Sequence, residues 1–349
     1  MGLKILHSAD WHLDSPFSGF DPERRSFLKD AQKQIPGKVA DICRREDCDL
    51  VLLSGDLFDG PASRDSIENL KNALEEMAVP VFISPGNHDF VAPGSPWLEE
   101  KWPENVYIFK GTMESVTVPE LSCRVYGAGY TSMDCPGLLE NFRAEGDERY
   151  CVAVLHGDPV QLHSPYCPVT AAQVRESGLQ YLALGHIHKY GAFRGGSTVC
   201  GWPGSPMGRG WDETGEKGVY LVQLEETASL RLMPLNLPRF FEWTVDSGEG
   251  TLEDKLPAGG SRDFYRITLT GNGTGDPEIL REKFPNLIVK DRRQRRDLWE
   301  SAGTDTLEGL YFQLLRQAAE DADPETARRA RLAAEISRNL LDGREVALP

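Results

Sequence analysis

The stretch Leu50–Asp56, with the sequence LVLLSGD, joins four consecutive apolar residues to a glycine and an aspartate. Short continuous apolar runs of this kind predict strands that are buried on both faces of a helix-covered sheet. Four other segments repeat the form, and each leads to a residue that can bind a metal ion. The five runs and the residues that follow them are 3–6 with Asp10, 50–53 with Asp56, 79–83 with Asn87, 151–155 with His156 and 181–184 with His186. Because ligand sites in open α/β sheets lie beyond the carboxyl ends of the strands, we expect these side chains to meet.

Helical segments alternate with the first three runs. Residues 27–46, broken at the Pro36-Gly37 pair, and residues 63–77 have the composition of crossover helices. Between 106 and 130, and again between 197 and 235, short β-rich pieces separated by glycine and proline indicate antiparallel additions. The pattern predicts an α/β fold in which helices cover a double sheet.

The pattern changes after Pro238. Residues 240–245, 264–269 and 287–289 are typical of strands, and residues 252–256 and 278–284 of helices. Apolar residues between 307 and 318 then follow the 3.6-residue period of a helix, and Pro324 opens a second helix that Gly343 closes. We therefore predict a large domain over residues 1–235, a small α+β domain over 236–300 and C-terminal helices over 301–349.

Composition is that of an ordinary globular protein. Of the 349 residues, 40% are hydrophobic and 26% charged. No apolar run approaches the roughly 20 residues that cross a bilayer, and the first residues are too short for a signal peptide. We expect a cytoplasmic protein without a membrane anchor. The seven cysteines are scattered and form no C-x-x-C pair, which argues against a disulfide framework and a zinc knuckle.

The formal net charge is −16, and it is unevenly distributed. Residues 281–349 contain 13 basic and 13 acidic side chains, so the first 280 residues carry the whole acidic excess. A protein that coats nucleic acid without selectivity would be basic. Because charges are screened over about 8 Å at physiological salt, a local basic patch can still bind a polyanion.

The polar motifs after the runs suit divalent metal ions. In order they are Asp10-Trp11-His12, Gly55-Asp56, Gly86-Asn87-His88-Asp89, His156-Gly157 and Gly185-His186-Ile187-His188, and they contain five of the seven histidines. Carboxylate, imidazole and amide donors together fit two hard-to-borderline ions, and D-x-H and H-x-H spacings place two donors on one side of an extended segment. Any one motif is equally well explained as an ordinary strand-to-loop junction, but five in this order are far more specific. His7 and His163 lack such neighbours, so we expect them to be structural.

This order of motifs resembles that of the calcineurin-like metallophosphoesterase superfamily over roughly the first 235 residues. The resemblance implies a four-layer αββα sandwich. It also implies that one ion is held by Asp10, His12, Asp56 and His188, and the other by Asp56, Asn87, His156 and His186, with Asp56 bridging. His88 corresponds to the superfamily's histidine beside the scissile phosphate, and we expect Asp89 to orient it.

The same resemblance implies a two-metal phosphodiesterase mechanism. Two ions about 3.5–4 Å apart activate a bridging hydroxide as nucleophile and stabilise charge on the phosphate oxygens. His88 would then act as the general acid that protonates the departing alkoxide. Manganese is the favoured ion, with iron, zinc and magnesium as alternatives.

Longer tracts resemble one branch of the superfamily. Residues 9–17 and 55–59 look like the DNA repair exonucleases of the SbcD type, and residues 203–209 and 213–218 are similar to the YhaO-like branch. This implies DNA as substrate, a capping domain over 236–300 that positions it, and C-terminal helices that dock an SbcC-type coiled-coil ATPase, with a homodimer as a further possibility. SbcD-type nucleases usually carry a histidine three residues after the bridging aspartate, where this chain has Asp59, which leaves the polarity of cleavage open.

Basic residues offer candidate phosphate contacts. The densest run is Arg292, Arg293, Arg295 and Arg296, and a solvated face at a domain boundary explains it equally well. Arg209 and, more weakly, Lys217 are further candidates. Trp11 lies beside two proposed ligands and could stack on a base, but core packing is the better interpretation.

Two rival functions stay open at this stage. The first is a metallophosphoesterase that acts on small nucleotides, pyrophosphates or phosphoproteins, which the acidic charge favours. The second is a partner-binding scaffold whose ions are only structural. The intact set of candidate ligands and the presence of His88 argue against the scaffold.

Overall fold

The computed structural model describes residues 2–248, 255–256, 260, 262–271, 277–293, 297–321 and 323–341. The chain divides into two compact units, Met1–Arg239 and Phe240–Pro349. The boundary between them lies four residues after the one predicted at residue 235. The further division at residue 300 stays a prediction.

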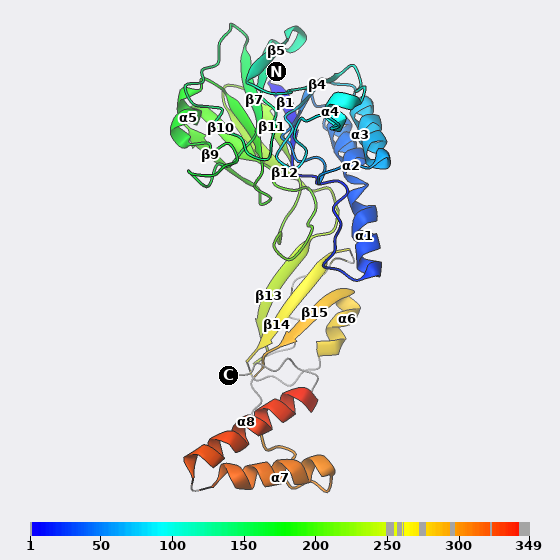
Figure 1. Ribbon diagram of the computed structural model, residues 1–349, viewed down its shortest axis with the longest axis vertical. Coiled ribbons are helices and arrows are strands. Elements are labelled where there is room, and N and C mark those ends of the chain that lie inside the picture. Colours follow the sequence, from blue (N-terminus) through cyan, green and yellow to red (C-terminus); the bar gives the residue numbers. More distant parts are fainter. Residues whose placement is uncertain are drawn as a thin grey trace. The chain divides into compact units, whose positions relative to one another are not determined.

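The first unit contains two six-stranded sheets (Figure 1). In spatial order the first sheet is β12 (Ala228–Met233), β11 (Val219–Leu224), β1 (Leu3–Ser8), β2 (Leu50–Leu53), β3 (Val81–Ile83) and β4 (Val106–Ile108). The second is β5 (Glu114–Val118), β6 (Cys123–Gly127), β7 (Tyr150–His156), β8 (Tyr181–Gly185), β10 (Thr198–Trp202) and β9 (Gly191–Gly195). All five apolar runs form strands, and β1, β2 and β3 run parallel, as do β7 and β8.

The main core lies between the two sheets. Alternate residues of the strands contribute to it, because successive side chains of a strand point to opposite faces. From the first sheet come Leu3, Ile5, Leu50, Leu52 and Phe82, and from the second Val125, Val152, Val154, Tyr181 and Ala183, all buried. At the intervening positions β2 and the middle of β7 are also apolar and buried, whereas β1 has Lys4 there.

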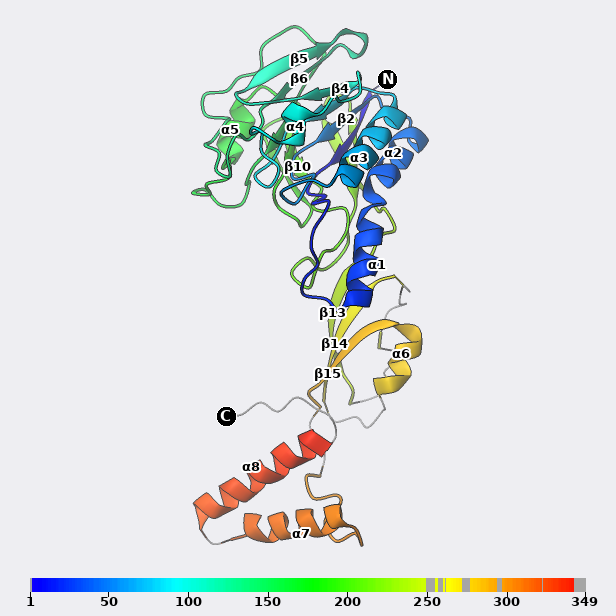
Figure 2. The same ribbon diagram turned by 45° about the vertical axis from the view of Figure 1, so that its right-hand side comes forward.

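Helices cover the outer face of the first sheet. They are α2 (Ile35–Arg45) and α3 (Arg64–Met77), which Figures 1 and 2 both place side by side, and α1 (Pro22–Gln32) leads into α2. The predicted helix over 27–46 begins five residues earlier, and its break lies before Pro36. Pro36 occupies the first turn of α2, where its missing N–H is not needed. The short helix α4 (Pro96–Glu99) follows β3.

The outer face of the second sheet has a thinner cover. It is made by α5 (Ala171–Glu176) and irregular segments, which bury Tyr126, Leu155, Val174 and Leu182 in a second cluster. The αββα layering is therefore present, with an outer layer here that contains little helix.

Most of the predicted antiparallel additions are correct. The pairs β5–β6, β9–β10 and β11–β12 are antiparallel, and a 3-10 turn, η1 (Pro119–Leu121), joins the first pair. β4 was predicted wrongly, because it pairs parallel with β3. The segment around α4 returns the chain to the starting end of β3, which a hairpin would not do.

The second unit contains a three-stranded parallel sheet in the order β13 (Phe240–Asp246), β14 (Phe264–Thr270) and β15 (Asn286–Asp291). The turn η2 (Pro277–Ile279) and α6 (Leu280–Lys283) lie where residues 278–284 predict a helix. Most of the predicted helix over 252–256, and Gly343, lie outside the described residues.

Two longer helices, α7 (Leu307–Ala319) and α8 (Pro324–Leu341), pack on each other in the second unit. The Tyr311 and Ser337 hydroxyls lie 2.7 Å apart, and the Arg338 guanidinium lies 3.9 Å from the centroid of the buried Phe312 ring. Among the described residues, none of the helices combines the length and apolar character that a membrane crossing requires.

Candidate metal centre

The candidate ligands lie on loops that leave the strands in unfavourable backbone conformations. Asp10, His12, Asp56 and His186 all have positive φ angles, between 46° and 94°. Side chains other than glycine rarely adopt this region, and such strain gathers at functional sites. Hydrogen bonds between the loops stabilise it: the Asp10 and His12 amides donate to the Gly55 and Asp56 carbonyls at 3.0 and 2.9 Å.

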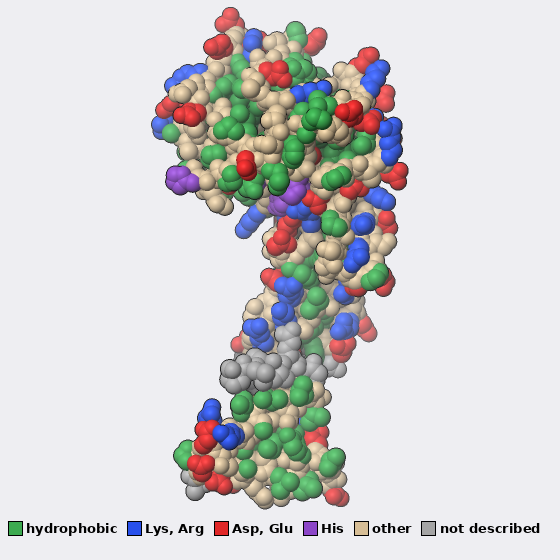
Figure 3. Space-filling view, in the orientation of Figure 1, with side chains coloured by type: hydrophobic (Ala, Val, Ile, Leu, Met, Phe, Trp, Pro, Cys, Tyr) green, Lys and Arg blue, Asp and Glu red, His purple; other side chains and the backbone are tan. Residues whose placement is uncertain are grey.

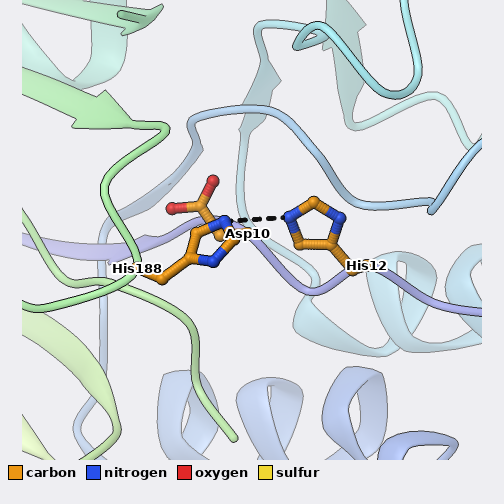
Figure 4. A group of neighbouring side chains, drawn as sticks. All are labelled: Asp10, His12 and His188. Atoms are coloured by element: carbon orange, nitrogen blue, oxygen red, sulfur yellow. Dashed lines mark hydrogen bonds between the residues drawn. The ribbon is translucent and has the colours of Figure 1, made fainter. Parts of the chain in front are cut away.

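Asp10, His12 and His188 form the first group of candidate ligands (Figure 4). Each offers a ligand atom within 4.8 Å of the others. The Nε2 atoms of His12 and His188 face each other at 3.1 Å, across the gap between the loop after β1 and the loop after β8. Two lone pairs this close repel unless a proton or a cation lies between them. The donors therefore fit a divalent ion.

Asp10, Asp56 and His156 form a second group, and Asn87 adjoins it. Nδ1 of His156 lies 2.8 Å from the Ser54 carbonyl, which fixes this nitrogen as the donor. In the neutral ring the lone pair is then on Nε2, which lies 3.5 Å from Oδ2 of Asp56 and 2.9 Å from Oδ1 of Asn87. Acceptor atoms that converge in this way also fit a cation.

The predicted ligand His186 lies outside these groups of donors. Among the described residues it belongs to none of the compact clusters of donors. Its ring centroid lies 4.7 Å from that of Tyr166, and its amide donates to Oδ1 of Asp10 at 2.9 Å. The backbone of His186 thus holds Asp10, whatever its imidazole binds.

Two glycines permit the close packing of these loops. Gly55 has φ +82°, and a Cβ there would lie 2.7 Å from Nδ1 of His156. A Cβ on Gly86 would collide with the Asp56 carboxylate. The glycines of the GD and GNHD motifs therefore serve close approach as well as turning.

His88 is held by Asp59, the residue that stands where SbcD-type nucleases usually have a histidine. Nδ1 of His88 lies 3.0 Å from Oδ1 of Asp59, and the same oxygen lies 3.3 Å from Nδ1 of His12. These bonds hold the pKa of Asp59 well below its usual range, and the bond to Asp59 raises the pKa of His88. His88, His12 and Asp56 also form a third compact group of donors.

Asp89 does not make the contact with His88 that we expected. Its carboxylate accepts backbone N–H groups of Gly86 at 2.7 Å and Leu57 at 2.8 Å, and lies within 3.3 Å of the Asp56 and Phe58 amides. Asp89 thus braces the loop that carries Asp56, and Asp59 is the partner of His88.

Glu213 anchors His188 from behind. Its Oε1 lies 2.9 Å from Nδ1 of His188, and Arg209 donates to the same carboxylate through Nε at 2.8 Å. Lys217 is buried, and its ammonium donates to the His188 carbonyl at 2.9 Å and to Ser205 at 3.1 Å. Burial lowers the pKa of His188 and the bond to Glu213 raises it, with a net rise. Arg209 and Lys217, predicted as phosphate contacts, both serve this network.

One known protein family matches the part of the chain that contains these motifs. The profile of the family described as calcineurin-like phosphoesterase matches residues 3–190, which is more than half of the chain. The chain belongs to this family. Members of the calcineurin-like family use divalent metal ions, and the Asp/His groups of this phosphoesterase are suited to such ions.

Two relatives illustrate the range of similarity. The chain is 35% identical over 245 residues to the uncharacterized metallophosphoesterase YhaO of Bacillus subtilis, a match that covers 64% of this chain and 57% of that protein. It is 22% identical over 332 residues to the SbcD component of the nuclease SbcCD of Staphylococcus epidermidis, covering 82% of this chain and 84% of that one.

Solved structures with similarity include a dimetal phosphatase from Danio rerio and the protein TT1561 of Thermus thermophilus. The first is 14% identical with a TM-score of 0.44, covering 66% of this chain and 96% of that one. The second is 13% identical with a TM-score of 0.40, covering 66% and 99%.

Three residues that are not proposed ligands were also assigned from the sequence. His7 is fully buried, with its nitrogens 2.7 Å from the Tyr181 hydroxyl and 2.9 Å from the Ser54 hydroxyl, as a structural histidine would be. His163 is exposed. Trp11 is 1% exposed and donates to Ser8 at 2.7 Å, which makes it a core residue.

The basic run of the second unit is only partly available to a ligand. Arg293 pairs with Asp291 through Nε at 2.9 Å and Nη2 at 2.7 Å, and its side chain is 6% exposed. Arg292 is exposed. Arg295 and Arg296 lie outside the described residues.

Proposed function

We propose that this phosphoesterase is a phosphodiesterase that requires two divalent ions and cleaves DNA, as a nuclease of the DNA repair type. The observation that carries the proposal is the pairing of His88 with Asp59 beside the groups of candidate metal ligands. Hydrolysis of a phosphodiester needs both charge neutralisation at the phosphate and a proton for the leaving oxygen, and these residues supply both.

We assign one ion to Asp10, His12, Asp56 and His188, and the other to Asp56, Asn87, His156 and His186. Manganese is the ion we favour. Bound divalent ions would supply a water-derived nucleophile and neutralise charge on the phosphate oxygens. Glu213 and Ser54 orient His188 and His156 through their Nδ1 atoms, which leaves each Nε2 free for an ion.

His88 has the contacts expected of a general acid. Its Nδ1 is held by Asp59, so Nε2 is the atom that can deliver a proton to the leaving alkoxide. The imidazole is 44% exposed, and a substrate can therefore reach it. Its raised pKa favours the protonated form that an acid needs.

Two features favour DNA as the substrate: the similarity to an SbcD component and the basic run of the second unit. The likeness to the SbcD component of the nuclease SbcCD extends over most of both chains. Arg292, together with Arg295 and Arg296, is our candidate for phosphate contact in a capping domain. The net charge of −16 favours the rival, a phosphoesterase for small nucleotides or phosphoproteins.

One panel of substrates separates these functions. Labelled single-stranded and duplex DNA, a cyclic nucleotide and a phosphopeptide are each incubated with the protein and Mn²⁺. We expect DNA to be shortened fastest. Preferred hydrolysis of the cyclic nucleotide or the phosphopeptide would support the rival enzyme, and metal-loaded protein inactive on all of them would support a scaffold.

We further propose that the C-terminal helices dock a partner, most directly the coiled coil of an SbcC-type ATPase in the cytoplasm. Apolar side chains gather over α7 and α8 on the face shown in Figure 3. On α7, Leu307, Leu310, Tyr311 and Leu314 are 42–86% exposed, and their i, i+3, i+4, i+7 spacing forms one stripe. The face predicted on α8 is weaker, because Leu332, Ala333 and Ile336 are half-buried and only Leu340 is well exposed.

Light scattering tests the partner proposal. A mixture of the purified protein with such an ATPase should contain a complex that Leu310→Asp together with Leu314→Asp abolishes. A complex that survives both substitutions would contradict docking at this stripe. A dimer of the protein alone, lost on the same substitutions, would assign the stripe to a second copy instead.

A further inference from the structure

A cavity of about 540 Å³ adjoins the candidate metal centre. Two loops of the first unit line it, residues 15–20 after β1 and residues 209–213 between β10 and β11, together with Asp59. Its volume lies within the range of pockets that hold small organic ligands, about 300–1,000 Å³. Asp59 connects it to the chemistry, because the same carboxylate holds His88.

Aromatic residues of both loops line this cavity. Phe17 and Phe20 come from the first loop and Trp211 from the second. Flat apolar rings with a polar edge nearby are the usual platform for a nucleobase, because every base has a π-face that can stack.

The first loop is fixed in position. Phe17 has φ +49°, which is a strained conformation for a bulky residue, and Asp14 has φ +71°. The Asp14 carboxylate accepts hydrogen bonds from the Ser63 amide at 2.8 Å and the Ser66 hydroxyl at 2.9 Å, at the start of α3. A strained loop that is tied to a helix presents Phe17 and Phe20 in a preformed arrangement.

The charges of the cavity favour an uncharged ligand. Its cation, Arg209, is bound to Glu213 at 2.7–2.8 Å, and Asp59 and Asp212 add further negative charge. A phosphate group would meet more carboxylates than guanidinium there, so electrostatic repulsion would oppose it. A neutral heterocycle would not be repelled, and its N–H groups could donate to the carboxylates.

We propose that this cavity receives the nucleobase of the nucleoside that leaves during hydrolysis. The inference rests on the proposed phosphodiesterase function and names a specificity site for it. A base stacked on an aromatic ring of this cavity would share the cavity with Asp59. The same carboxylate holds His88, the residue proposed to protonate the departing sugar oxygen.

Dinucleoside monophosphates test the site directly. The products of their hydrolysis reveal which nucleoside departs as the free alcohol, and analogues are then made that lack the base of that nucleoside or of the other. With Mn²⁺ present, loss of the departing base should lower kcat/KM about 10-fold, the usual worth of one base stacked on an aromatic ring. Loss of the other base should have a smaller effect.

The variants separate ring stacking from bulk. Trp211→Leu should erase the penalty for the missing base, whereas Trp211→Phe, which keeps a ring, should retain most of it. Phe20→Leu provides a second variant on the opposite loop. Trp102→Leu is the matched control, because Trp102 packs on Trp97 and is not among the lining residues.

A binding measurement tests the cavity without relying on turnover. Calorimetry should show a free deoxynucleoside binding at millimolar concentration to the wild type and at least several-fold more weakly to Trp211→Leu. Hydrolysis of both analogues at the same rate by the wild type would overturn the cavity assignment and leave the phosphodiesterase intact. Nucleoside binding that depends on Trp211 in a protein unable to hydrolyse any dinucleotide would overturn the proposed function and support the cavity.

Discussion

A substitution of His88 can separate catalysis from metal binding, because the assigned ligand sets are complete without it. We predict that His88→Ala keeps its metal ions and DNA affinity while losing about 10²–10⁴-fold in turnover, the range of general acid catalysis. A nitrophenyl phosphodiester, whose phenolate leaves without a proton, should be hydrolysed far better by the variant than DNA is. Equal losses on both substrates at unchanged metal content would point to phosphate positioning instead.

Glu213 tests whether the residues behind the ligands matter. Glu213→Gln should weaken the binding of one of the two ions about 10–100-fold, since partners that orient a metal-bound histidine are usually worth that much. Titration calorimetry with Mn²⁺ measures the two affinities. Glu216→Gln is the matched control, because Glu216 is exposed and pairs with Arg239. Unchanged affinities in Glu213→Gln would remove its positioning role.

His7 makes stability depend on pH. Burial lowers the pKa of His7 to about 3, whereas in the unfolded chain it lies near 6.5. Between these values the unfolded chain binds a proton that the folded protein excludes, so stability falls as the pH falls. From pH 7.5 to 5.0, without metal, the wild type should lose about 2 kcal/mol more than His7→Gln. Urea titrations of both proteins in chelator measure this, and parallel losses would contradict it.

The candidate ligands and their order could be predicted from the sequence, but the residues that orient them could not. Asp59 and Glu213 both lie in quoted tracts, yet their contacts join loops far apart in the chain, as from Glu213 to His188. A carboxylate three residues after Asp56 was visible, but only the folded loops show that it reaches both His88 and His12.

Among the elements, α7 has one buried face and one exposed apolar stripe. Phe312 is fully buried beneath Arg338, whereas Leu310 and Leu314 are 54% and 56% exposed. Phe312→Ala should cost about 3–5 kcal/mol and accelerate hydrogen exchange throughout α7 and α8. Leu310→Asp should leave exchange nearly unchanged. Equal acceleration in both variants would show that the stripe is packed, and not available to a partner.

The elements were predictable where a pattern was local. All five apolar runs became strands, because a run buried on both faces needs no knowledge of its neighbours. β4 was misread as antiparallel because three residues, Val106–Ile108, carry no signal of direction, and pairing with β3 decides it. The break between α1 and α2 was displaced because proline is tolerated in a first helical turn.

Over the whole molecule, every assigned metal ligand lies in the first unit, which also lies in the part of the chain that carries the acidic excess. Divalent cations bound by these ligands would neutralise part of this charge where the proposed polyanionic substrate approaches. We therefore expect turnover to depend on bound ions for substrate approach as well as for chemistry.

The number of ions per chain, measured together with activity, tests the central claim most directly. Metal analysis of the wild type after loading with Mn²⁺ should give two ions per chain and active phosphodiesterase. Asp56→Asn, which alters the carboxylate assigned to both ions, should retain fewer than two and hydrolyse no substrate of the panel. An active Asp56→Asn protein with two ions still bound would contradict the account.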